Sequence, residues 1–223
     1  GNYMTLFSFG AGLPRIALNS LYMSVLTVVI TLVISSLGGY AFARFTFRGR
    51  DALFLLTLSI LMVPFATLII PLYVLLNAVG LANSLVGVAL IVAMFQLPFA
   101  TYMMRISFEA IPRELEESAL IDGCGTFGVL WRVMMPSVTP CLVTVGLFAF
   151  LAAWNEFFAP LIMLPDPAKQ TLAVGLFQFV SQETSANWPV FAAGAVLAAL
   201  PVVVLFFLLQ KYIVGGLTTG AVK

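Results

Sequence analysis

Five apolar runs dominate the sequence and restrict what it can fold into. They cover residues 18–42, 52–76, 85–104, 139–164 and 188–209. A helix needs about 20 apolar residues to cross the ~30 Å hydrocarbon core of a bilayer, and every run reaches that length. A segment buried in lipid must satisfy its backbone hydrogen bonds internally, which a helix does. The sequence therefore predicts an all-α, polytopic helical membrane protein with five visible spans.

The composition supports a membrane protein and excludes several other classes. The chain is 62% hydrophobic and 9% charged, whereas soluble domains are about 25% charged. The net charge is only +1, so the chain lacks the excess of basic residues that binds nucleic acid. The absence of histidine excludes histidine-based catalysis and His-ligated metal sites. Cys124 and Cys141 form neither a metal-ligand cluster nor a disulfide framework, so we interpret them as packing residues.

A polar insert, residues 105–136, separates the third and fourth runs. Pro112 suits the first turn of a helix, and Gly123 is a predicted stop. Glu114, Glu116 and Glu117 would lie near the positive end of that helix. Asp122 would lie at the opposite end, where the helix dipole disfavours a carboxylate by up to ~1 kcal/mol, a weak sign that it has a partner elsewhere.

The second half of the insert predicts another short helix. Thr126 can cap it, Trp131 and Val133 continue it, and Pro136 ends it and turns the chain into the fourth run. From the residues alone, two readings stay open. The insert is either a lever that receives force from outside the membrane or an ordinary amphipathic loop.

The remaining segments complete the predicted organisation. Residues 1–17 form a pre-membrane segment, 165–187 an external loop and 213–223 a C-terminal tail. Pro64 and Pro71 are expected to kink the second span, and Gly38 and Gly39 indicate close helix packing in the first.

Lysine and arginine residues of short loops predict the orientation. One side holds Arg44, Arg48, Arg50, Arg105, Arg113, Arg132, Lys211 and Lys223, and the other holds Arg15 and Lys169. The insert and the C-terminus are therefore expected to be cytoplasmic and the N-terminus external. An external N-terminus without a signal peptide leads us to expect a preceding span that is lost from this chain.

Polar side chains within the runs are candidates for contact with a transported solute. Asn155 and Glu156 lie beside the aromatic Trp154, a combination that suits a sugar. The same groups could instead bond between helices or cap an interfacial belt. Gln96 is a weaker candidate that could equally bridge two helices.

A motif in the insert resembles a known family. The pattern E-S-A-x3-G-x9-V-x-M-P, from Glu117 to Pro136, is similar to the EAA loop of permease subunits of ATP-binding-cassette (ABC) importers, with Ser118 in place of the middle alanine. The flanking IPRELEESALIDG resembles the carbohydrate-uptake branch. Further resemblance to the smaller permease of maltose-type importers lies in residues 19–21, 40–50, 153–161 and 210–223.

The resemblance implies a type I ABC-importer permease fold, normally of six spans, with a cytoplasmic coupling helix. It implies that a separate ATPase is contacted through Glu117, Ser118, Ala119, Asp122, Gly123 and Pro136, and that the tail Gly216–Lys223 runs along that ATPase. It also implies an external loop that enters a solute-binding protein, with the candidates Gln182, Glu183, Thr184 and Asn187.

The expected function is therefore that of a transport subunit and not of an enzyme. The chain has no G-x4-G-K-[ST] phosphate loop, so ATP and Mg are expected on the partner ATPase. The expected partners are a second, non-identical permease, two ATPase subunits, an extracytoplasmic solute-binding protein and membrane lipid, without nucleic acid. The expected location is a bacterial or archaeal plasma (inner) membrane, and the expected solute is a sugar or oligosaccharide. Glycerol-phosphate-type or amino-sugar solutes are alternatives. A secondary transporter is a further alternative, but it would need several buried ionisable residues and internal repeats. In this sequence only Glu156 is such a residue, and no clear repeat is seen.

Overall fold

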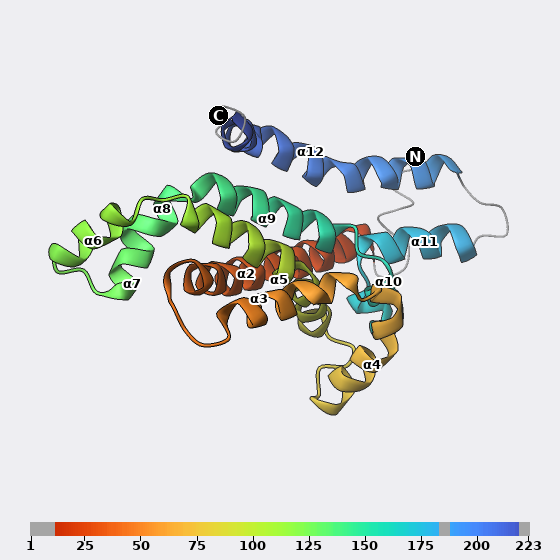
Figure 1. Cartoon of the computed structure of the whole chain (residues 1–223). Helices are drawn as coiled ribbons and strands as arrows, with labels where there is room; N and C mark the ends of the chain where they lie inside the picture. Colours follow the sequence, from red (N-terminus) through yellow and green to blue (C-terminus); the bar gives the residue numbers. More distant parts are fainter. Residues whose placement is uncertain (1–11, 183–187, 219–223) are drawn as a thin grey trace. The chain divides into compact units, whose positions relative to one another are not determined.

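The computed structural model describes residues 12–182 and 188–218, and these residues form helices without any strand among them (Figure 1). The elements are α2 (Leu13–Arg44), α3 (Arg50–Ser59), η1 (Ile60–Met62), α4 (Phe65–Ala78), α5 (Leu85–Glu109), α6 (Arg113–Ile121), α7 (Thr126–Val129), the π-helix η2 (Leu130–Met134), α8 (Met135–Ser137), α9 (Thr139–Trp154), α10 (Phe158–Met163), η3 (Pro167–Lys169), α11 (Leu172–Gln182) and α12 (Trp188–Thr218).

Three of the described helices are long and apolar enough to cross a membrane. They are Leu13–Arg44, Leu85–Glu109 and the part Phe191–Lys211 of α12. Two broken pairs raise the number to five if each pair is one span: Arg50–Met62 with Phe65–Ala78, and Thr126–Ser137 with Thr139–Trp154. Because α2 begins at Leu13, the end of the predicted pre-membrane segment belongs to the first long helix.

The second apolar run is two helices, where one kinked span is predicted. The break lies at Val63, which has an extended conformation (φ −88°, ψ 120°), and at Pro64 before α4. The ring of a proline disfavours the helical conformation in the residue before it, which explains why the break is placed here. Pro71, the other predicted kink, lies inside α4 without ending it.

The fourth run is also interrupted, so residues 139–164 do not form one continuous helix. Helix α9 ends at Trp154, and α10 begins only at Phe158. The Asn155 amide donates to the Leu151 carbonyl (2.9 Å), and a Glu156 carboxylate oxygen accepts from the Ala159 N–H (3.0 Å). These side chains compete for backbone groups and thereby favour a break.

The predicted external loop 165–187 is largely helical where the structure describes it. It contains η3 and α11. Residues 183–187 lie outside the described residues. The apolar residues of TLAVGLFQF bury part of α11, since Leu172 and Leu176 join a core cluster with Leu13, Phe150 and Trp154.

Two compact units divide the chain. Unit 1 comprises Gly1–Val28, Pro64–Ala93 and Ala149–Leu208, and unit 2 comprises Val29–Val63, Met94–Phe148 and Leu209–Lys223.

In unit 1, the segment before α11 is tied to the first turns of α2. The Asn19 amide donates to the carbonyls of Ala168 (3.0 Å) and Gln170 (2.9 Å), and the Ser20 hydroxyl accepts from the Leu172 N–H (2.7 Å). These bonds satisfy backbone groups that would otherwise be left without partners near an apolar core.

In unit 2, α2 and α5 approach each other closely at a glycine. A Cβ atom on Gly39 would lie 2.6 Å from the Met104 Cβ and 2.9 Å from the Arg105 nitrogen. At Gly38 the nearest neighbour, a Thr101 methyl, would lie at an ordinary 3.6 Å. The predicted close packing is therefore confirmed, and Gly39 is the residue that permits it.

Candidate functional site

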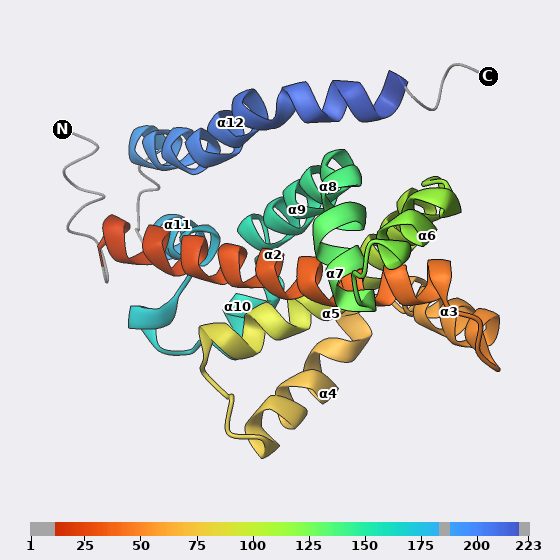
Figure 2. The same cartoon turned by 90° about the vertical axis from the view of Figure 1, so that its left-hand side faces the viewer.

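The predicted lever corresponds to residues 113–137 of unit 2, which we call the α6–α8 block. Figure 2 shows α6 near the C-terminal end of α2, and α7 packs against α6.

Helix α6 ends in a glycine cap. Gly123 has a φ of +88°, the left-handed conformation. Its N–H donates to the Leu120 carbonyl (3.0 Å), and the Cys124 N–H donates to the Ala119 carbonyl (3.0 Å). This pair of bonds is the Schellman motif, which satisfies carbonyls that the end of a helix leaves free. The predicted stop at Gly123 is confirmed, and a backbone conformation is the reason for glycine there.

The start of α6 also matches its sequence signal. Pro112 is the residue immediately before the helix, and Glu114 and Glu116 lie in the first turn. Carboxylates at this position interact favourably with the helix dipole. The Ser118 hydroxyl donates to the Glu114 carbonyl (2.7 Å), so this predicted coupling residue is engaged within its own helix.

Glu116 anchors α6 to the C-terminal end of α2. One carboxylate oxygen accepts a hydrogen bond from the Tyr40 hydroxyl (2.7 Å), and the other forms an ion pair with Arg44 Nε (3.2 Å). Arg44 Nη2 also donates to the carbonyls of Phe108 (2.8 Å) and Ile111 (2.7 Å). The end of α2, the end of α5 and the first turn of α6 are therefore linked through one guanidinium and one carboxylate.

An apolar core underlies the block. Ala119 is 8% exposed and packs in a cluster with Tyr40, Phe108, Leu130 and Met134. This small residue therefore packs within its own chain. Its contact with a partner stays a prediction.

The opposite face of the block carries large apolar side chains that the described residues leave exposed. Ile121 is 86% exposed and Phe127 73%, and Leu115, Leu120 and Trp131 are about half exposed. Glu117 and Asp122 are exposed beside them. Within the described part of the chain the Asp122 carboxylate pairs with no side chain. Exposed apolar groups with a polar rim are typical of a protein-docking surface.

The second half of the block differs in detail from its prediction. Gly125, and not Thr126, precedes α7, and the helix continues through the π-turn η2 into α8. Pro136 lies inside α8 and is exposed, and the chain turns two residues later at Val138. The helices before and after this break are bent by 80°.

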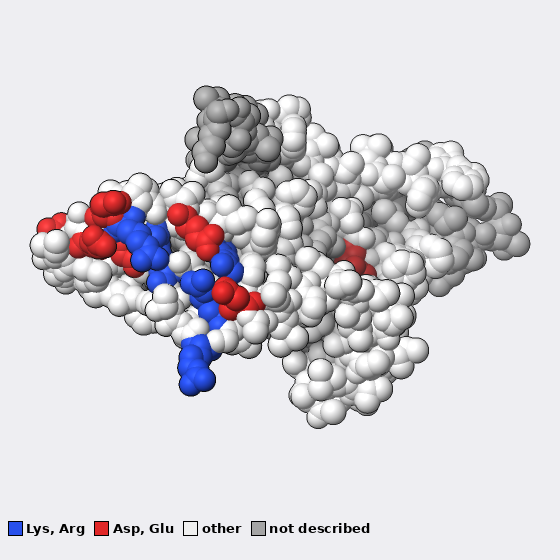
Figure 3. All heavy atoms as spheres, viewed as in Figure 1, with Lys and Arg blue, Asp and Glu red and all other residues white. Residues whose placement is uncertain are grey.

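Charged side chains gather in this part of unit 2. Figure 3 shows basic and acidic groups together over α3 and α6. Arg105 forms an ion pair with Glu109 on α5 (2.8 Å) and lies 3.9 Å from Asp51 on α3. Its guanidinium also lies over the Phe54 ring, 4.2 Å from the centroid. Such clustering is expected where helix ends meet water at a membrane surface.

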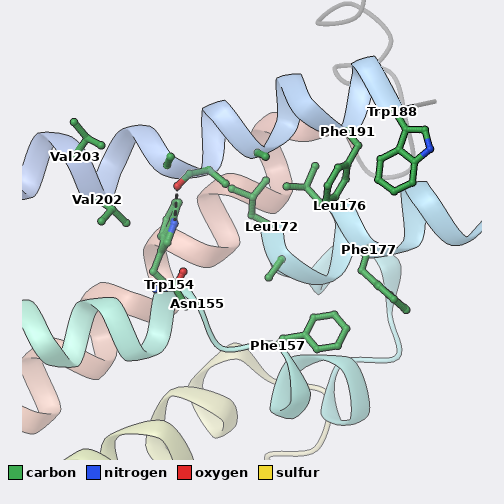
Figure 4. Close-up of a pocket in the computed structure, with 14 residues that line it drawn as sticks. Trp154, Asn155, Phe157, Leu172, Leu176, Phe177, Trp188, Phe191, Val202 and Val203 are labelled. Atoms are coloured by element: carbon green, nitrogen blue, oxygen red, sulfur yellow. Dashed lines mark hydrogen bonds between the residues drawn. The ribbon is translucent and has the colours of Figure 1, made fainter. Parts of the chain in front are cut away.

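The solute candidates are divided between the two units. Asn155 and Trp154 line a cavity of about 710 Å³ in unit 1, together with aromatic residues of α11 and α12 (Figure 4). Trp154 is buried, and its indole N–H donates to the Ala198 carbonyl (3.0 Å). The Glu156 carboxylate accepts from the Ala159 N–H in the first turn of α10, and Gln96 lies on α5 in unit 2.

The predicted binding-protein loop is mostly outside the described residues. Gln182 is the last residue of α11, whereas Glu183, Thr184 and Asn187 fall in the part that the structure does not describe.

Sequence reasoning missed the role of Tyr40 and Arg44. Arg44 entered the prediction only as a positive charge of a short loop. The available signal was their spacing of four residues, which places both on one face of α2. The partner Glu116 lies 76 residues from Tyr40, and no local pattern identifies it.

Comparison with known proteins places these features in a family context. The profile of the family described as "Binding-protein-dependent transport system inner membrane component" matches residues 35–218. The sulfoquinovosyl glycerol transport system permease protein SmoH of Agrobacterium fabrum is 37% identical over 222 residues, covering 100% of this chain and 77% of its own. The arabinooligosaccharides transport system permease protein AraQ of Bacillus subtilis is 37% identical over 222 residues, covering 100% of this chain and 78% of its own.

A solved structure shares the fold. It is a crystal structure of a bacterial ABC transporter involved in the import of the acidic polysaccharide alginate, with a TM-score of 0.82 and 24% identity. The match covers 95% of this chain and 79% of that one.

Proposed function

The chain belongs to the family of inner membrane components of binding-protein-dependent transport systems, and from this premise we propose that it is one permease subunit of an ABC importer for a sugar or oligosaccharide. It forms half of a translocation pathway and takes its driving force from a separate ATPase. The observation that carries the proposal is the exposed face of the α6–α8 block, where Ile121 and Phe127 are uncovered beside Glu117 and Asp122.

That face receives a nucleotide-binding subunit. Burial of two large apolar side chains supplies affinity, and the carboxylates select a basic partner surface. Gly123 and Pro136 shape the block, Ser118 and Ala119 support it from within, and the tail Gly216–Lys223 adds contact along the same partner. ATP and Mg are bound and used by that partner, since this chain has no phosphate loop.

The complete importer contains four further chains. These are a second, non-identical permease, two copies of the ATPase and an extracytoplasmic solute-binding protein. Residues 182–187 lie on the side of the binding protein, with Gln182, Glu183, Thr184 and Asn187 as its contacts. The block and the C-terminus face the cytoplasm of a bacterial or archaeal cell, since short-loop arginines gather there.

The solute class comes from the relatives, whose names specify arabinooligosaccharides and sulfoquinovosyl glycerol. Asn155 offers an amide at an aromatic-lined cavity, a combination that suits the polar edges and apolar faces of a sugar ring. Trp154, Glu156 and Gln96 support the helices around the pathway through packing, capping and contact between spans.

Purification of the tagged full-length chain from its own membrane tests the proposal. We expect a nucleotide-binding chain and a second permease to co-purify in fixed stoichiometry, with ATP hydrolysis that is absent from the isolated subunit. Uptake into vesicles is then measured with labelled arabinotriose, maltotriose, an amino-sugar disaccharide and a glycerol phosphodiester. ATPase activity of the isolated chain, or uptake driven by an ion gradient alone, would contradict the proposal.

A further inference from the structure

A buried arginine at the end of α2 has three acceptors around it: its Nη2 donates to two carbonyls, and its Nε forms an ion pair with a carboxylate oxygen. The Arg44 side chain is 5% exposed, and its partners are two carbonyls and the Glu116 carboxylate. A guanidinium removed from water is costly unless such partners compensate for the lost hydration. Its planar fork can bond the end of α5 and the first turn of α6 at once, which the single ammonium group of a lysine would do less well.

The carboxylate of this pair is held by two groups of one helix. Tyr40 and Arg44 are four residues apart on α2, so both point from the same face toward Glu116. Glu116 is itself only 18% exposed. A displacement that separates Glu116 from this face of α2 would break a partly buried ion pair and a partly buried hydrogen bond together.

The covalent routes out of α6 are less direct. Backward, the chain passes through the turn at Ile111, whose carbonyl Arg44 also holds. Forward, it passes through the π-turn η2 and the 80° bend at Val138 before it reaches α9. Glu116, in contrast, connects α6 directly to α2 through its contacts with Tyr40 and Arg44.

We propose that Tyr40, Arg44 and Glu116 form a positioning clamp that makes α6 and the C-terminal end of α2 move as one body. This inference rests on the proposed function, in which α6 receives the movement of the ATPase. The clamp passes that movement to the first long helix of this chain, and the residues act by position, without touching nucleotide or solute.

Distance measurement between two spin labels tests the clamp directly. The labels are attached at Leu37→Cys on α2 and Glu114→Cys on α6, both exposed, in a chain that also carries Cys124→Ala and Cys141→Ala. In the assembled complex we expect the distance to stay constant between the nucleotide-free state and the vanadate-trapped state. Glu116→Ala should let it shift by ~2 Å or more, the scale of helix movements in switching proteins.

Glu109→Ala is the matched control. It removes a glutamate of the same unit whose ion pair with Arg105 stays within α5, and it should leave the distance constant. Uptake per ATP hydrolysed should fall about tenfold in Glu116→Ala and remain unchanged in Glu109→Ala. If Glu116→Ala does not fold, the double variant Arg44→Met with Glu116→Ala removes both buried charges and is measured in the same way.

Two results would overturn the clamp: a nucleotide-driven shift in the unmodified pair, or a constant distance in the variants that lack Glu116. Failure of the proposed function has a different signature, namely that no ATPase co-purifies. The clamp can then still be tested in the isolated chain. Loss of Glu116 should broaden the distribution of distances between the two spin labels, and loss of Glu109 should not.

Discussion

At the scale of single residues, Gly39 and Gly123 are required for different physical reasons. Gly39 lacks space for a side chain, since a Cβ atom would lie 2.6 Å from Met104. Gly123 has open space, with nothing described within 4 Å, but its φ of +88° disfavours any L-residue with a Cβ. The two positions should therefore respond differently to the same substitution.

Gly39→Ala is expected to destabilise the chain by ~1–3 kcal/mol, because the added methyl group must force α2 and α5 apart. Gly38→Ala is the neighbouring control, since its nearest contact would be an ordinary 3.6 Å. Thermal unfolding of the purified proteins in detergent compares them. Equal unfolding temperatures for the two variants would show that the helices do not meet at Gly39.

Gly123→Ala is expected to cost ~1–2 kcal/mol at the end of α6, because alanine resists the left-handed conformation. Gly123→Asn should cost less, since asparagine tolerates this conformation better. Hydrogen exchange of the Gly123 and Cys124 amides, which make the capping bonds, is the measurement. Exchange that is no faster in Gly123→Ala than in the unmodified chain would contradict the cap.

At the scale of elements, local signals predict some helices well and others poorly. Pro112 and Gly123 bracket α6 because capping depends on a few neighbouring residues. The helix break within the apolar run 139–164 is not predicted, because the many apolar residues around Asn155 and Glu156 dominate the mean hydropathy, whereas the side chains of these two residues bond to nearby backbone groups. In α11, apolar residues within a nominally external loop form a helix that the core stabilises.

The exposed face of α6 and α7 carries its own prediction. Ile121→Ser and Phe127→Ser should each weaken the association with the ATPase at least tenfold, since each removes about 1.5–3 kcal/mol of apolar burial. Both residues are exposed in this chain, so its unfolding temperature should change little. The yield of co-purified ATPase is measured against Ile106→Ser, an exposed apolar control on α5. Unchanged ATPase recovery in both variants would place the docking surface elsewhere.

At the scale of the whole molecule, the distribution of charge predicts how the chain sits in its membrane. Ser137, in the α6–α8 block, and Asn77, at the end of α4, are both exposed. Labelling of single cysteines with a membrane-impermeant maleimide, in a chain without Cys124 and Cys141, distinguishes the two sides. We expect Asn77→Cys to react in intact cells and Ser137→Cys only after the membrane is opened. The reverse pattern would refute the orientation.

The sequence by itself determined the membrane class, the helical architecture and the limits of α6, because the length of an apolar run and the chemistry of a helix cap are local properties. Only the tertiary structure decided that Ala119 is buried within its own chain, that Arg44 and Tyr40 hold Glu116, and that Trp154 packs against α12. These relations join residues far apart in the chain, and which distant groups meet depends on how helices pack. Packing depends on the shape of whole helix faces, and a linear pattern of residues does not record that shape.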